Sequence, residues 1–95
     1  MANALNGGLV LQVQADVGDI GSIADGAWYE TADIDVPGAQ LGDFVVATYL
    51  ADLAGLMCTG YVRAAGKVRV VFFNKTGGPV DLPWQYARVR VISWA

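Results

Sequence analysis

Apolar and polar residues alternate with a period of two along most of this chain, a pattern typical of strands that bury one face. In the first such segment, 9–17, Leu11 and Val13 alternate with Gln12 and Gln14. The pattern predicts further strands, and the full set is 9–17, 28–36, 44–50, 56–64, 67–74 and 85–94, with one or two shorter ones. No window combines apolar residues at helical spacing with capping residues, so helix is expected at most as one short turn near 51–55.

Turn residues separate these segments. Pro37-Gly38 ends the second strand, because Pro lacks an N–H donor and Gly permits a positive φ. Ala65-Gly66 and the cluster at 74–79 mark two more turns. Parallel βαβ units need crossover helices, and none is indicated. The sequence therefore predicts an all-β fold, a compact antiparallel β-sandwich of jelly-roll or Greek-key type with about 6–8 strands.

The alternation also predicts the core. In the loop at 19–26, Ile20 and Ile23 are expected to reach it. The strand residues predicted to be buried are Leu11, Val13, Ile34, Val46, Cys58, Val62, Val68, Val70, Val89 and Val91.

The strand at 44–50 is apolar on both faces. One face carries Phe44, Val46 and Leu50, and the other carries Val45, Ala47 and Tyr49. A strand of this kind is buried on both sides or faces a partner.

The composition points the same way. A chain of 95 residues forms one domain, 1–95, with 1–8 expected as an extended N-terminal arm. Apolar residues make up 55% of the chain, above the usual value of about 45–50%. A domain of this size buries only roughly 60–65% of its unfolded surface. Part of the apolar excess is therefore expected in an interface, and a homo-oligomer is predicted.

Membrane insertion and secretion are not expected. Phe44–Val62 contains a single charge, Asp52, and a spanning helix would place it near the bilayer centre at a cost of about 2.5–3.5 kcal/mol. This window also contains Gly55 and Gly60 and divides into two strands. Residues 1–8 lack the basic and apolar regions of a secretory signal.

Charge is distributed unevenly along the chain. Eight of the nine acidic residues lie at or before Asp52, and all six basic residues lie after it. Pairing of acidic and basic strands across one sheet is the favoured interpretation. The alternative is a dipolar subunit whose acidic side meets the basic side of a neighbour. The net charge of −3 argues against nucleic acid as a partner.

Catalytic chemistry is not indicated. The chain has no His, so Ser22, Ser93 and Cys58 lack a base, and no enzymatic activity and no cofactor are expected. Glu30 and Asp33 as an acid pair for glycoside hydrolysis form a weak signal, because any acidic protein offers such pairs.

A metal site is also not favoured. Asp33, Asp35 and Asp43 could be imagined as a calcium cluster, but the spacing of an EF-hand is absent and solvation of a strand face explains them better.

The aromatic residues allow two interpretations. Trp84, Tyr86 and Trp94, together with Trp28 and Tyr29, could form a platform for stacking sugars. Aromatic residues in a β-sandwich are more often core or interface anchors, and this interpretation is favoured.

Three motifs carry a family resemblance. They are Val36-Pro-Gly-Ala-Gln-Leu-Gly-Asp-Phe-Val-Val46, Gly60-Tyr-Val-Arg-Ala-Ala-Gly-Lys-Val-Arg-Val70 and Phe73-Asn-Lys-Thr-Gly-Gly-Pro-Val80. In this order they resemble small virion proteins of tailed bacteriophages, often head-decoration (capsid cement) proteins, over about residues 20–92.

The resemblance implies a subunit made in the host cytoplasm that binds the major capsid protein on the outside of the shell, often as a trimer, and stabilises it. The rival function is a receptor- or glycan-binding module of a phage tail or spike. The residues proposed for contacts with partners are Phe44, Val45, Tyr49, Val71, Phe73, Trp84, Tyr86, Arg88, Arg90 and Trp94.

Overall fold

The computed structural model describes residues 10–94, and within this range the chain forms nine strands and no helix. The strands are β1 (Val10–Asp16), β2 (Ser22–Ile23), β3 (Trp28–Glu30), β4 (Ile34–Asp35), β5 (Phe44–Tyr49), β6 (Met57–Ala64), β7 (Lys67–Phe73), β8 (Val80–Asp81) and β9 (Tyr86–Ile92). The all-β, sandwich-like prediction is confirmed. The arm expected at 1–8 lies outside the described residues.

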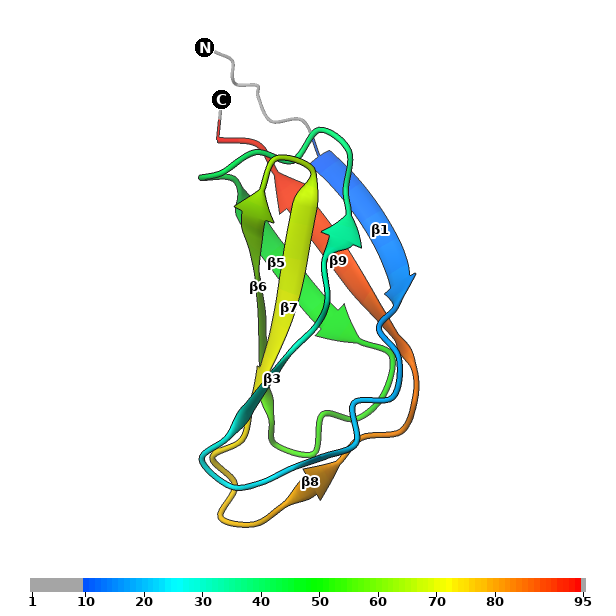
Figure 1. Ribbon diagram of the computed structural model, residues 1–95, viewed down its shortest axis with the longest axis vertical. Coiled ribbons are helices and arrows are strands. Elements are labelled where there is room, and N and C mark those ends of the chain that lie inside the picture. The colour runs from blue at the N-terminus through cyan, green and yellow to red at the C-terminus, as the bar shows by residue number, and fades with distance from the viewer. Residues whose placement is uncertain (1–9, 95) are drawn as a thin grey trace.

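Two antiparallel sheets form the body of the molecule. One has the order β1-β9-β5, and in the other β7 lies between β6 and the two short strands β3 and β4. The sheets face each other, and the short β2–β8 pair lies at one end of the sandwich (Figure 1). The C-terminal strand β9 thus occupies the centre of its sheet.

The two central strands supply most of the core. Val68, Val70 and Phe72 of β7 are fully buried. The inward residues of β9, Ala87, Val89 and Val91, face them and are almost fully buried. Ile20 and Ile23 also reach the core, as expected. Of the predicted core residues, those confirmed as buried are Ile34, Val62, Val68, Val70, Val89 and Val91.

The remaining core predictions need correction. Val46 is 59% exposed, because Tyr49 and its inward neighbours of β5 take the core-facing side of that strand. Leu11, Val13 and Cys58 are only partly buried, because β1 and β6 are the outermost strands of their sheets.

The single strand expected at 28–36 is interrupted between β3 and β4. Thr31 is buried there, and its N–H donates to the carbonyl of Val70 (2.9 Å). Its hydroxyl oxygen accepts from the Val70 N–H (3.1 Å), in the place of a backbone carbonyl. The alternation shifts at this point, so Trp28 faces outward while Ile34 faces inward. Regular alternation over 28–36 would place both residues on one apolar face, and this expectation is wrong for Trp28.

The predicted turns form as expected. At Pro37-Gly38 the N–H of Ala39 donates to the carbonyl of Val36 (3.0 Å), and Gly38 adopts the positive φ of 96° that such a turn requires. The N–H of Gly66 donates to the carbonyl of Ala39 (2.8 Å), which ties this turn to the β6–β7 hairpin.

The apolar window Phe44–Val62 forms β5, a loop and most of β6. Among residues 10–94, no helix is long and apolar enough to cross a membrane.

Candidate interaction surfaces

The outer face of the β1–β9–β5 sheet carries two arginines side by side on β9, named here the Arg88/Arg90 pair. Strand register places each arginine next to a glutamine of β1. The Nε–H of Arg88 donates to Oε1 of Gln14 (2.9 Å), and that of Arg90 donates to Oε1 of Gln12 (2.7 Å). These neutral amides fix the two guanidinium groups without neutralising them. Together with Val46 and Thr48 of β5, the four side chains line an open concavity.

One end of this face is apolar. Register places Val10, Ile92 and Phe44 in one row across the three strands. Trp94 packs on Phe44, with 5.9 Å between the ring centroids. Phe44, Val46 and Trp94 are all more than half exposed. The Phe44 patch is therefore defined as Val10, Phe44, Val46, Ile92 and Trp94.

The other end of this face is aromatic and acidic. The indole N–H of Trp84 donates to Oδ1 of Asp16 (2.6 Å), and this bond, with one from the Gly18 N–H, lowers the pKa of the Asp16 carboxyl. Trp84 nevertheless stays 61% exposed. The Trp84 pocket is the concavity lined by Asp19, Asp81, Leu82, Pro83 and Trp84.

A second apolar patch lies on the outer face of the other sheet. Register places Trp28, Phe73 and Met57 in one row across β3, β7 and β6. Trp28 is 65% exposed and Met57 is 63% exposed. Val71 lies one position further along the same face of β7. These four residues are named the Trp28 patch.

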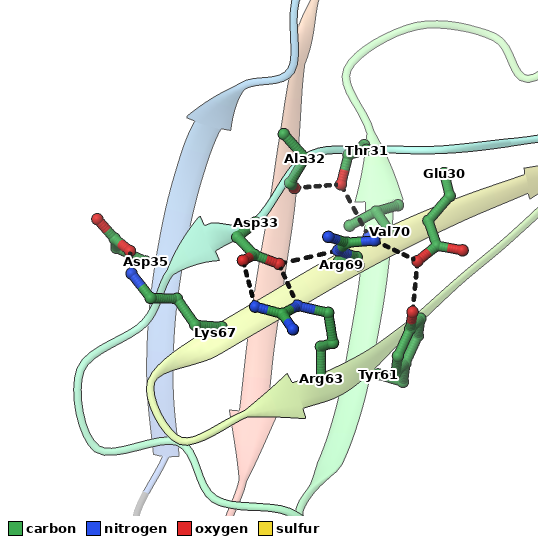
Figure 2. Close-up of polar contacts among 10 residues, drawn as sticks. All are labelled: Glu30, Thr31, Ala32, Asp33, Asp35, Tyr61, Arg63, Lys67, Arg69 and Val70. Atoms are coloured by element: carbon green, nitrogen blue, oxygen red, sulfur yellow. Dashed lines mark hydrogen bonds and ion pairs between the residues drawn. The ribbon is translucent and has the colours of Figure 1, made fainter.

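The rest of that face is a network of ion pairs (Figure 2). Asp33 accepts from the Nε–H groups of Arg63 (2.6 Å) and Arg69 (2.8 Å). These arginines hold the pKa of the Asp33 carboxyl well below its usual range. Glu30 accepts hydrogen bonds from the hydroxyl of Tyr61 and from Arg69. Both bonds lower the pKa of the Glu30 carboxyl, and the bond from Tyr61 has the larger effect.

Lys67 completes this network by pairing with Asp35. Acidic β3–β4 and basic β6–β7 thus pair across one sheet, as the favoured interpretation of the charge distribution predicted.

Most of the residues proposed for contacts lie on one face. The outer face of the β1–β9–β5 sheet or its margin holds six of them: Phe44, Trp84, Tyr86, Arg88, Arg90 and Trp94. Two others, Val71 and Phe73, belong to the opposite face of the molecule. The structure does not bring these two groups together.

Val45 and Tyr49 face the core. Tyr49 is only 5% exposed, and its ring meets Phe72 edge-on at 5.4 Å between centroids. Its hydroxyl donates to the carbonyl of Pro83 (2.6 Å) and accepts from the Gln85 N–H (2.8 Å). Tyr49 therefore fixes the loop that presents Trp84, and its assignment as a contact residue is corrected to a supporting one.

Sequence reasoning missed Met57 and the role of Trp28 on the second patch, as well as the two carboxylates of the Trp84 pocket. Met57 lies on the same face of β6 as Thr59 and Tyr61, and this spacing of two could have indicated that it is exposed. Asp19 and Asp81 are far apart in sequence, so only the tertiary structure reveals their proximity.

The groups considered for metal binding have other partners. Asp33 and Asp35 are paired with cations, and Asp43 accepts from the backbone N–H groups of Gln40 (3.0 Å) and Trp94 (3.2 Å). Within residues 10–94, no three His, Cys, Asp or Glu side chains are grouped so as to hold a metal ion. Burial raises the pKa of the Cys58 thiol to about 11, which keeps it protonated and poorly reactive near neutral pH.

No protein-family model matches the chain, and no curated protein matches it at a significant level. The resemblance to phage virion proteins therefore stays a prediction.

Proposed function

We propose that the protein is a capsid decoration, or cement, subunit of a tailed phage, which binds the outside of the major-capsid-protein shell and stabilises it as a homotrimer. The observation that carries this proposal is the presence of two exposed apolar patches on opposite faces of one small sandwich. A subunit that strengthens a shell must hold more than one neighbour, and two separate contact surfaces allow this.

The composition of these patches fits protein contacts. Interface energy is concentrated in Trp, Tyr and Arg side chains, and the β1–β9–β5 face carries Trp94 at one end, Trp84 and Tyr86 at the other and the Arg88/Arg90 pair between them. The Trp28 patch is bordered by the ion-pair network, so an apolar centre adjoins a polar margin. We assign the Trp28 patch to the shell and the β1–β9–β5 face to contacts between copies.

The test is binding of the purified chain to empty shells of the phage that encodes it. Saturable binding that raises the temperature of shell disruption is expected. Met57→Ser combined with Trp28→Ser should remove both effects, because it makes the exposed patch polar while leaving the core residues Val70 and Phe72 intact. Thr59→Ser, on the same face of β6, is the control. Absence of binding by the unmodified chain contradicts the proposal.

A glycan-binding module is the second candidate, favoured by one observation. The Trp84 pocket places an exposed indole beside the carboxylates of Asp19 and Asp81, and such a set can stack on and hydrogen-bond to a sugar. Under this function Trp84→Ala abolishes binding on a glycan array and leaves the oligomer intact. Under the cement function the same change weakens the oligomer or shell attachment, and no glycan is bound by the unmodified chain.

A further inference from the structure

The charged side chains of the described residues fall into three groups. In the ion-pair network, Glu30, Asp33 and Asp35 are balanced by Arg63, Lys67 and Arg69. The Arg88/Arg90 pair lies apart from them, on the outer face of the other sheet. The third group holds the remaining charges: Asp16 at the end of β1, Asp43 just before β5, Asp81 in β8, and Asp19, Asp25, Asp52 and Lys75 in loops and turns.

The Arg88/Arg90 pair is prepared for an anionic partner. No carboxylate among residues 10–94 forms an ion pair with either guanidinium. Gln14 holds the Nε–H of Arg88, and Gln12 holds both the Nε–H and one Nη2–H of Arg90. The side chains therefore lose little freedom when a carboxylate binds the remaining N–H groups. Two residues apart on one strand, the arginines project on the same side at a spacing of roughly 6–7 Å. They therefore fit a pair of carboxylates rather than one small anion.

The Trp84 pocket has the complementary chemistry. It offers the carboxylates of Asp19 and Asp81 and an exposed indole ring. Arginine binds such a site well, because its planar guanidinium pairs with carboxylates and also stacks on aromatic faces. One oxygen of Asp19 accepts from the Gly21 N–H (3.1 Å), which orients that carboxylate within the loop.

We propose that the Arg88/Arg90 pair of one copy of this chain docks into the Trp84 pocket of another copy. Each molecule carries both halves of the contact, so no further partner is required. Phe44 and Val46 adjoin the Arg88/Arg90 pair on the same face and would add apolar contact next to the ion pairs. In a closed ring, each copy uses one half toward each neighbour, and the proposed trimer is such a ring. This inference deepens the proposed function but does not require shell binding.

The first experiment measures the association of the purified chain by sedimentation equilibrium at micromolar concentrations. Arg88→Gln with Arg90→Gln, and separately Asp19→Asn with Asp81→Asn, should each weaken association at least about tenfold. Asp25→Asn with Asp52→Asn removes the same two negative charges elsewhere, and Lys75→Gln removes one positive charge elsewhere. Both controls should leave association unchanged. Raising the salt from about 50 to about 500 mM should weaken association of the unmodified chain, because the contact is ionic at its centre.

The second experiment tests the contact itself by exchange of charge. Arg88→Glu with Arg90→Glu in one chain, and Asp19→Lys with Asp81→Lys in another, should each give monomers. A mixture of the two should give a complex containing both chains, because each supplies the half that fits the other. Circular dichroism and thermal unfolding establish whether both charge-reversed variants fold. If one of them does not fold, the Gln and Asn double variants of the first experiment test the contact instead.

The inference is overturned if the unmodified chain is monomeric, or if its oligomer survives either of the two neutral double variants. Shell binding by a monomer leaves the proposed function standing and rejects the inference. An oligomer that depends on both halves of the contact but binds no shell supports the inference and rejects the proposed function.

Discussion

At the scale of single residues, Asn74 joins two segments at the loop end of the sandwich. It is fully buried, and its amide N–H groups donate to the carbonyls of Ile23 (2.7 Å) and Gly78 (2.8 Å). Its Oδ1 accepts from the N–H (2.9 Å) and the hydroxyl (2.8 Å) of Thr76. One side chain thus holds the loop at 19–26 against the turn at 74–79, close to the Trp84 pocket. The motif predicted this turn, but it did not reveal that Asn74 bridges to Ile23.

Replacing Asn74 by Ala should destabilise the fold by about 1–3 kcal/mol, because buried carbonyl and N–H groups lose their partners. The measurement is the free energy of unfolding in urea. Thr76→Val is the comparison, and it should cost less, since Thr76 is exposed and water can replace its bonds. Equal stability of Asn74→Ala and the unmodified chain would show that the bridge contributes nothing.

At the scale of elements, β5 and β6 approach closely where the two sheets meet, and Gly60 permits this. A Cβ at Gly60 would lie 2.7 Å from Cγ1 of Val45 and 3.3 Å from the carbonyl oxygen of Arg69. The φ of Gly60 is not positive, so the constraint is space rather than backbone conformation. The glycine therefore lets the edge strands of the two sheets pack together.

Gly60→Ala should accordingly destabilise the protein by about 1–3 kcal/mol, through overpacking against Val45. Gly78→Ala is the matched control, because nothing lies within 4 Å of a Cβ there and its φ is also not positive. Differential scanning calorimetry should show a lower unfolding temperature for the first variant alone. Similar unfolding temperatures for both variants would mean that β5 and β6 accommodate a Cβ at position 60 without loss of stability.

The network between β3–β4 and β6–β7 makes stability depend on pH. The folded-state pKa values of Asp33 and Glu30 are lowered, so on acidification the unfolded chain takes up protons first. Their stabilising contribution is present above the unfolded values of about 3.9–4.3 and is lost as the pH falls below them. Urea unfolding of the unmodified chain from about pH 6 to about pH 2 should show this decline. Asp33→Asn should make the curve shallower, and an unchanged slope would contradict the role of this carboxyl.

The strands that could be predicted from the sequence are those that turn only one face toward the core. β1, β6, β7 and β9 each contain 7 or 8 residues, and their alternation is regular. The sequence could not predict the break at Thr31, because a hydroxyl replaces a carbonyl there through a contact 39 residues away. Nor could it orient β5, since both faces of that strand are apolar and Val46 could equally well have been buried.

At the scale of the whole molecule, a surface could be predicted from the sequence only where all its residues belong to one strand. Arg88 and Arg90 alternate with buried Val89 and Val91, so their shared outward face follows from the sequence. The Trp28 patch and the Trp84 pocket combine segments that are distant along the chain, and only strand pairing or loop packing brings them together. Surfaces of the second kind require the structure.

At this scale the proposed assembly should also appear in thermal unfolding. An oligomer stabilises its folded subunits by mass action, so the unfolding temperature should rise with protein concentration. Phe44→Ser should reduce this dependence, because Phe44 adjoins the Arg88/Arg90 pair on the face assigned to contacts between copies. Met57→Ser, a change at a residue of similar exposure on the opposite face, should preserve it. Scans at concentrations that differ about a hundredfold measure the effect, and the same unfolding temperature throughout would be incompatible with self-association of this chain.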